Sequence, residues 1–118
     1  ESPIAMDRIE QMSSLVRGML DSAIDAFVRH DTAVAGMLSQ RDDEVDALRD
    51  ELIEELVATM SSHPDTVSPG LALIFVVQSI ERAGDHAKNI AEYVVNVVEG
   101  IDLRHVAPAE SGPAPASS

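Results

Sequence analysis

Apolar side chains recur every three or four residues in three successive blocks of this chain, with polar side chains between them. This spacing is typical of amphipathic helices, in which residues three and four positions apart share one face. The first block predicts a helix over residues 5–29. Its apolar face consists of Ile9, Met12, Val16, Met19, Ala23 and Phe27.

The second block predicts a helix that follows His30 and ends near Ser61. Asp31 is suited to be its N-cap, because a carboxylate can accept a hydrogen bond from a first-turn amide. Pro64 and the residue before it resist a helical conformation, which explains the predicted end. The apolar stripe of this helix consists of Val34, Leu38, Val45, Leu48, Leu52 and Leu56.

The third block predicts a helix that starts with Asp65 or Ser68 as its cap, has Pro69 in its first turn and ends at Gly100 as a C-cap. Its apolar residues alternate at steps of four and three, as in the seam of a helix bundle. Gly84 falls on this seam among small residues, so we expect it to allow a close helix contact. The seam residues are Leu73, Val77, Ile80, Gly84, Ala87, Ala91, Val94 and Val98.

Three helices of this length joined by short turns predict an all-α fold, an antiparallel three-helix bundle over residues 1–106. Residues 107–118 are rich in Pro, Ala and Ser, and we expect them to form a disordered tail. The chain of 118 residues is 45% hydrophobic but has one Tyr, two Phe and no Trp. The core is therefore expected to be aliphatic.

The formal net charge is −13, from 8 basic and 21 acidic residues. A chain of this sign repels phosphate backbones and anionic lipid, so nucleic acid and membrane surfaces are not expected as partners. The longest apolar run, residues 71–77, is too short to span a membrane, and we expect a cytoplasmic protein. The start at Glu1, without a Met, suggests a piece of something longer. The absence of Cys leaves oxygen and imidazole as the available metal ligands.

Polar side chains spaced four residues apart lie beside the apolar stripes of the second and third helices. Carboxylates four apart in a helix repel one another by a few tenths of a kcal/mol, and a bound cation reverses that cost. The two sets lie about midway along antiparallel neighbours, which can bring them to the same height. Such oxygen ligands suit a hard cation, iron or manganese. The residues are Asp42, Asp46 and Asp50 on the second helix, and Glu81, Asp85 and Asn89 on the third.

The alternative is an ordinary solvated acidic surface, neutralised in part by Arg49, Arg82 and Lys88. His86 adjoins Asp85, but neighbouring helical residues point about 100° apart. His86 is therefore either an additional ligand or a surface histidine. The other histidines fall at helix ends or in loops, where caps or solvated side chains are the usual roles.

The stretch ERAGDHAKNIAEYVVNVVEG (81–100), together with RDDEVDALRDEL (41–52) and DLRHV (102–106), resembles the PhoU family, and in particular the second of its two tandem three-helix repeats. The resemblance implies multinuclear iron, zinc or nickel clusters on the bundle surface. It carries the family's metal-binding motif over to Asp42, Asp46, Asp50, Glu81, Asp85 and Asn89, and implies that the column of Glu81, Asp85 and Asn89 is a metal-facing or partner-facing surface. Only one repeat is present here.

The resemblance also implies a non-catalytic negative regulator of phosphate uptake and phosphate-starvation signalling. Its expected partners are the ATPase subunit of the phosphate transporter and a sensor histidine kinase, and we further expect a homo-oligomer such as a dimer. One alternative is a carboxylate-bridged di-metal enzyme, although the paired Glu-x-x-His motifs of that class are absent from the sequence. The other is an acidic dimerisation module without metal.

Overall fold

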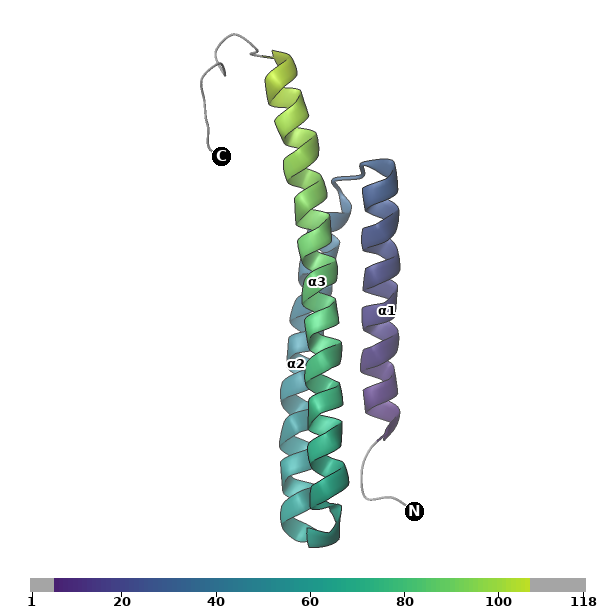
Figure 1. Cartoon of the computed structure of the whole chain (residues 1–118), viewed down its shortest axis with the longest axis vertical. Coiled ribbons are helices and arrows are strands. Elements are labelled where there is room, and N and C mark those ends of the chain that lie inside the picture. Colours follow the sequence, from purple (N-terminus) through teal and green to yellow (C-terminus); the bar gives the residue numbers. More distant parts are fainter. Residues whose placement is uncertain (1–5, 107–118) are drawn as a thin grey trace.

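Three helices form an up-down-up bundle in the computed structural model, which describes residues 6–106. They are α1 (Met6–Arg29), α2 (Val34–Ser62) and α3 (Val67–Val106), and a short 3-10 helix, η1 (Pro64–Thr66), connects α2 to α3. Figure 1 shows α1 and α3 running in one direction and α2 in the other. Residues 6–106 contain no strand. The predicted antiparallel three-helix bundle is confirmed, whereas the predicted disorder of residues 107–118 lies outside the described residues.

The core is a column of aliphatic side chains between the three helices, at the positions that the periodic stripes predict. Burying a side chain of this kind contributes about 1.5–3 kcal/mol of stability, so the column is the main source of cohesion between the helices. Its buried members are Ile9, Met12, Val16, Met19 and Ala23 of α1, Leu38, Val45, Leu52 and Leu56 of α2, and Val77, Ala87 and Ala91 of α3.

All three aromatic side chains lie outside this core. Phe27 is 54% exposed, Phe75 73% and Tyr93 59%. Phe27 follows Ala23 by four residues and so lies on the apolar face of α1, but it is exposed and does not belong to the buried core. The core stripe of α1 passes from Ala23 to Ala26, which is fully buried, because small residues let the helices approach more closely than a ring would allow.

The turn between α1 and α2 is a Schellman motif. The amide nitrogen of Asp31 donates to the carbonyl oxygen of Ala26 at 3.0 Å, and His30 adopts a left-handed conformation with φ of 57°. The carboxylate of Asp31 accepts a hydrogen bond from the amide of Ala33 at 2.9 Å. Because α2 begins only at Val34 and has no side-chain cap, the prediction of Asp31 as its N-cap is wrong. Asp31 stabilises the turn instead.

The connection between α2 and α3 is tighter than the sequence indicates. Pro64 opens η1, and the buried hydroxyl of Thr66 donates to the carbonyl oxygen of His63 at 2.6 Å. α3 follows at Val67, so Asp65 lies within η1 and Ser68 within α3. The prediction that one of these two residues caps α3 is therefore wrong.

The third helix continues beyond its predicted end. Gly100 lies inside α3, which extends to Val106, so the prediction of a glycine C-cap is wrong. The partly buried Val97 and Val98 extend the apolar pattern up to this point, and a glycine inside a helix costs only about 1 kcal/mol. Although α3 has 40 residues, none of the helices within 6–106 combines the length and the apolar character that crossing a membrane requires.

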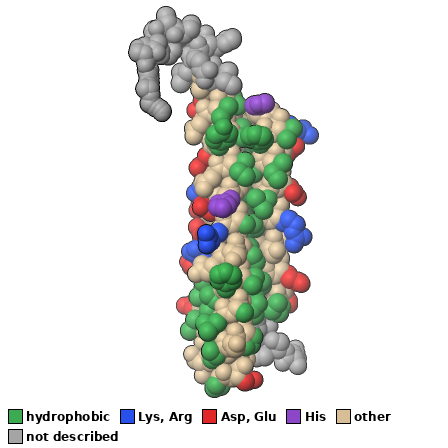
Figure 2. Space-filling model, in the orientation of Figure 1, with side chains coloured by type: hydrophobic (Ala, Val, Ile, Leu, Met, Phe, Trp, Pro, Cys, Tyr) green, Lys and Arg blue, Asp and Glu red, His purple; other side chains and the backbone are tan. Residues whose placement is uncertain are grey.

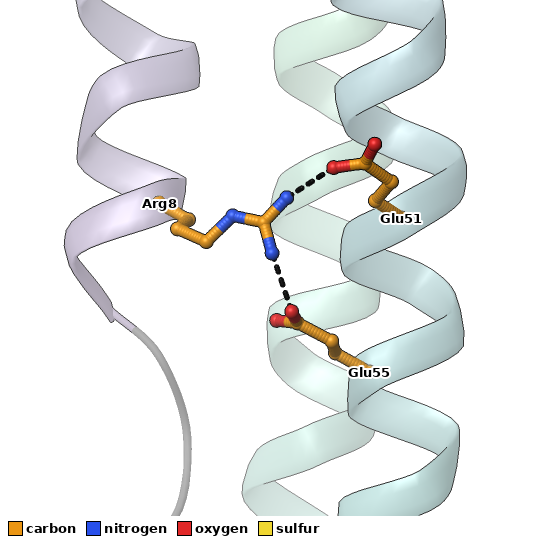
Figure 3. A network of polar contacts seen from close by, with 3 residues as sticks. All are labelled: Arg8, Glu51 and Glu55. Atoms are coloured by element: carbon orange, nitrogen blue, oxygen red, sulfur yellow. Dashed lines mark hydrogen bonds and ion pairs between the residues drawn. The ribbon is translucent and has the colours of Figure 1, made fainter.

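Arg8 connects α1 to α2 near the start of the bundle (Figure 3). Its guanidinium group donates to a carboxylate oxygen of Glu51 and to one of Glu55, which lie on successive turns of α2. Exposed ion pairs of this kind contribute at most about 1 kcal/mol each. The contact favours one relative height of α1 and α2, whereas the aliphatic core provides the stability.

Gly84 lies where α3 meets both other helices. It is buried, and a Cβ atom at this position would lie 3.4 Å from Cγ2 of Val16 in α1. The same atom would lie 3.7 Å from Oδ1 of Asp42 and 3.7 Å from Cγ1 of Val45, both in α2. The position therefore has room for one methyl group in ordinary contact, but not for a larger side chain.

We expect Gly84→Val to lower the free energy of unfolding by about 1–3 kcal/mol, because the branched side chain has to displace Val16 or Val45. Gly84→Ala should change it by less, since the methyl fits and alanine favours the helix by up to about 1 kcal/mol. Urea unfolding followed by far-ultraviolet circular dichroism measures both variants. A Gly84→Val protein as stable as the parent would contradict the close approach of the helices.

Candidate functional site

Four carboxylates come together between the middle parts of α2 and α3. Asp42 and Asp46 belong to α2, and Glu81 and Asp85 to α3; we call these four residues the carboxylate cluster. Asp42 is only 5% exposed, and the other three are partly buried. The four-residue spacing predicts a stripe beside the core, whereas the structure places Asp42 inside the packed interface.

The step pattern of α2 explains this burial. Leu38 and Val45 are fully buried core residues seven positions apart, and Asp42 occupies the position between them, four after the first and three before the second. Residues at these steps share one helix face, so Asp42 belongs to the apolar seam itself. On α3, Glu81 and Gly84 continue the same steps from Val77. The predicted apolar stripe skips from Leu38 to Val45, a step of two helical turns. The position between them had to be filled by a buried residue, and this was the signal in the sequence that pointed to Asp42.

Asp42 has one partnered and one unpartnered carboxylate oxygen. Its Oδ2 lies 3.6 Å from the ammonium nitrogen of Lys88, which is itself on α3. Its Oδ1 is buried and accepts no hydrogen bond within the described residues. Burial is the main reason that the pKa of Asp42 lies above its ordinary value, followed by the charge of Asp46; the ammonium of Lys88 opposes both, and Asp85 adds a smaller rise.

Glu81 forms the other end of the cluster. Burial raises the pKa of Glu81, and so does the neighbouring carboxyl group of Asp46; the guanidinium of Arg49 opposes the rise. Nη1 of Arg49 lies 3.5 Å from Oε2 of Glu81, while Nη2 of the same group lies 3.2 Å from Oδ1 of Asp50. Oδ1 of Asp46 is a second buried oxygen for which the described residues provide no hydrogen-bond partner. The cluster thus has a basic side chain at each end and two orphaned oxygens.

Two of the six predicted ligands lie outside this cluster. The side chain of Asp50 is 74% exposed and is paired with Arg49. Asn89 is exposed and lies beside His86 on the side of α3 that faces α1. The structure therefore brings together Asp42, Asp46, Glu81 and Asp85, but neither Asp50 nor Asn89.

The donors of the cluster fit a hard cation or a first-row metal, because buried, unpartnered carboxylate oxygens are the ligands that such ions prefer. Asp42 and Asp46 supply one such oxygen each. However, no three His, Asp or Glu side chains in the described part of the chain are arranged so that they could hold one ion. Lys88 and Arg49 hold Asp42 and Glu81 at the two ends instead.

An apolar hollow of about 540 Å³ lies between α1 and α3, at a place that the hydrophobic pattern of the sequence does not predict. Figure 2 shows hydrophobic side chains gathered on the face that these two helices form. Phe27 and Tyr93 supply its aromatic walls, which is where two of the three exposed rings lie. The lining residues are Ile24, Phe27, His86, Asn89, Ile90 and Tyr93.

Comparisons with known proteins identify relatives over most of the chain. The phosphate-specific transport system accessory protein PhoU homolog of Pseudomonas aeruginosa is 40% identical over 106 residues, which are 90% of this chain and 44% of that protein. The homolog of Caulobacter vibrioides is 38% identical over 80% of this chain and 41% of its own length. The PhoU accessory protein of Escherichia coli is 35% identical over 75% of this chain and 36% of its own length.

This chain spans less than half the length of these curated relatives. No solved structure matches it. The PhoU domain family matches residues 9–94. This range contains the whole carboxylate cluster and the larger part of each of the three helices. The chain therefore belongs to the PhoU domain family.

Proposed function

We propose that this chain is a non-catalytic regulatory domain of phosphate uptake, which restrains phosphate-starvation signalling by linking the phosphate transporter to its sensor histidine kinase. Support comes from family membership and from the relatives, which are named as accessory proteins of phosphate-specific transport. Its partners in this proposal are the ATPase subunit of the transporter and the kinase. We place this function in the cytoplasm and expect the chain to self-associate.

The carboxylate cluster is the observation that carries the proposal beyond family membership. We propose that Asp42, Asp46, Glu81 and Asp85 hold iron, zinc or nickel once their side chains turn away from Lys88 and Arg49. In the metal-free arrangement of the described residues, no three His, Asp or Glu side chains could hold one ion. A bound cation would neutralise carboxylates that otherwise repel one another across the α2–α3 interface, and so would hold the two helices together. The ligand role of Asp50 and Asn89 rests on the resemblance alone, because neither faces the cluster.

A non-catalytic role fits the chemistry of the cluster better than a di-metal enzyme does. Such enzymes on helix bundles use Glu-x-x-His pairs that project inward, and the sequence contains none. The four grouped residues are all carboxylates, and the nearest histidine in the sequence, His86, lies on the α1–α3 side. Binding and charge neutralisation are what this arrangement can do.

The first test is metal content. Replacing both Asp46 and Asp85 with Asn should remove most of the bound iron, zinc or nickel and leave the helical content unchanged, because both residues are only partly buried at the edge of the core. Elemental analysis of protein purified without an affinity tag or chelator measures this. Asp50→Asn is the matched control, since it removes one exposed carboxylate outside the cluster. Equal metal content in the double variant and the parent would refute the assignment.

The second test is the pH dependence of stability in metal-free protein. The folded-state pKa values of Asp42 and Glu81 lie above their ordinary values of 3.8 and 4.5, so the folded chain holds these protons more tightly than the unfolded chain. Their contribution to stability is therefore present at low pH and is lost as the pH rises through the raised values.

An Asp42→Asn/Glu81→Gln variant, which mimics the protonated side chains, should consequently be more stable than the parent at neutral pH. That advantage should shrink as the pH falls toward 4.5 and below. Urea unfolding at several pH values measures this difference in stability. Asp43→Asn is the control, because it removes the charge of an exposed aspartate outside the cluster. A stability difference that does not vary with pH would contradict the burial of charge described here.

The third test concerns partners. A chain of net charge −13 gains encounter rate from a basic partner surface, so binding to the ATPase subunit or to the cytoplasmic region of the kinase should weaken as salt rises. Asp85→Lys and Glu81→Lys should weaken it further, whereas Arg82→Ala should matter less. Binding titrations at low and high salt, with and without chelator, measure these effects. Binding that responds to neither salt nor chelator would argue against both roles of the acidic surface.

A further inference from the structure

Lys88 is the only lysine in the chain, since the other seven of the eight basic residues are arginines. Its ammonium nitrogen lies 3.6 Å from Oδ2 of Asp42, the most buried carboxylate of the cluster, and 29% of its side chain is exposed. Desolvated carboxylates are costly without a positive partner, and Lys88 is the group that partners Asp42 here. The chain therefore provides its own cation at the place where a metal ion would bind.

We propose that Lys88 is an internal competitor for cations at the carboxylate cluster: its ammonium group holds Oδ2 of Asp42 in the metal-free chain, and a divalent cation that binds Asp42 displaces it toward solvent. The inference rests on the proposed cation site, and it adds that competition from Lys88 lowers the affinity of that site for metal ions. A divalent cation on Oδ1 of Asp42 and the ammonium of Lys88 on Oδ2 would repel each other strongly, because both would lie against one poorly solvated carboxylate. Metal binding and the ion pair of Lys88 with Asp42 therefore weaken one another.

The chemistry of the two basic residues assigns this role to Lys88 and not to Arg49. The guanidinium of Arg49 contacts Asp50 as well as Glu81, so it keeps an exposed partner if Glu81 turns to a metal. Asp42 is the only carboxylate among the described residues that Lys88 contacts. Its ammonium is a compact charge on a flexible four-carbon stem, which can move into solvent.

An alternative partner for the ammonium group of Lys88 lies nearby on α3. Glu92 is exposed and lies one helical turn further along α3, at the i+4 spacing that lets side chains meet on a helix surface. With 29% of its side chain exposed, Lys88 is not enclosed by the core. Withdrawal therefore requires a rotation of one side chain and no separation of the helices.

The affinity test uses Lys88→Met, which keeps the length of the side chain and removes its charge, and Ni²⁺ as the probe. Isothermal titration calorimetry on the metal-free full chain should show Ni²⁺ binding about tenfold tighter than in the parent, a typical size for coupling between two binding events. Arg82→Met is the matched control, because it removes one exposed positive charge from the same helix and should change the affinity about twofold or less. Lys88→Arg, which keeps the charge, should not gain affinity.

The second readout needs no variant. Because Lys88 is the only lysine, its reaction with an amine-selective N-hydroxysuccinimide ester can be followed by peptide mass spectrometry, with the terminal amine as an internal reference. Saturating Ni²⁺ should speed up the modification of Lys88 severalfold relative to that reference, since the ammonium leaves Asp42 for solvent. This measurement stays decisive if Lys88→Met does not fold.

The outcomes separate the two proposals. If the parent binds Ni²⁺ but Lys88→Met binds it no more tightly, or if Ni²⁺ leaves the modification of Lys88 unchanged or slower, the competition is refuted and the cation site stands. If Arg82→Met gains as much affinity as Lys88→Met, the effect is one of overall charge and the competition is again refuted. If neither the parent nor Lys88→Met binds Ni²⁺, iron or zinc, both the cation site and the competition fail.

Discussion

A carboxylate buried in an apolar helix interface must find a positive partner or give up its charge, and Asp42 places this constraint on the interface between α2 and α3. The other features of the region follow from it. Gly84 has no side chain, so α3 comes close enough to cover Asp42 and remove water from it. That desolvation raises the pKa of Asp42, and the ammonium of Lys88 offsets part of the cost. The close helix packing therefore creates the need for a positive partner at Asp42, and the ion pair with Lys88 meets it.

The few basic residues of this acidic chain contribute in unequal ways because their surroundings differ. Arg8 bridges Glu51 and Glu55 at the surface, where water screens the attraction and each pair contributes little. Lys88 and Arg49 lie against partly or fully buried carboxylates, where removing one partner leaves an uncompensated charge in a poorly solvated place. With 8 basic and 21 acidic residues, most of the acidic side chains have no basic residue to neutralise them, which is why the chain keeps a net charge of −13.

α3 serves two surfaces at once because it packs against both other helices. Toward α2 it carries the acidic half of the carboxylate cluster, and toward α1 it forms a wall of the apolar hollow through Ile90 and Tyr93. A core built from aliphatic and small side chains makes this possible, since the helices are close together and the aromatic rings remain outside.

The sequence by itself determined the three helices, the aliphatic core and the height at which the acidic sets meet, because helical periodicity and turn residues are local properties of the chain. It also determined membership of the PhoU domain family through the motifs of the second and third blocks. Only the tertiary structure decided that Asp42 is buried and that Asp50 is exposed, since burial depends on how closely α3 approaches α2. The tertiary structure also decided the position of Phe27: the apolar stripe of the sequence predicts that it is buried, but the close packing of small residues leaves it exposed. It likewise decided the partner of Lys88, because that partner, Asp42, lies on another helix and cannot be read from the order of residues along the chain.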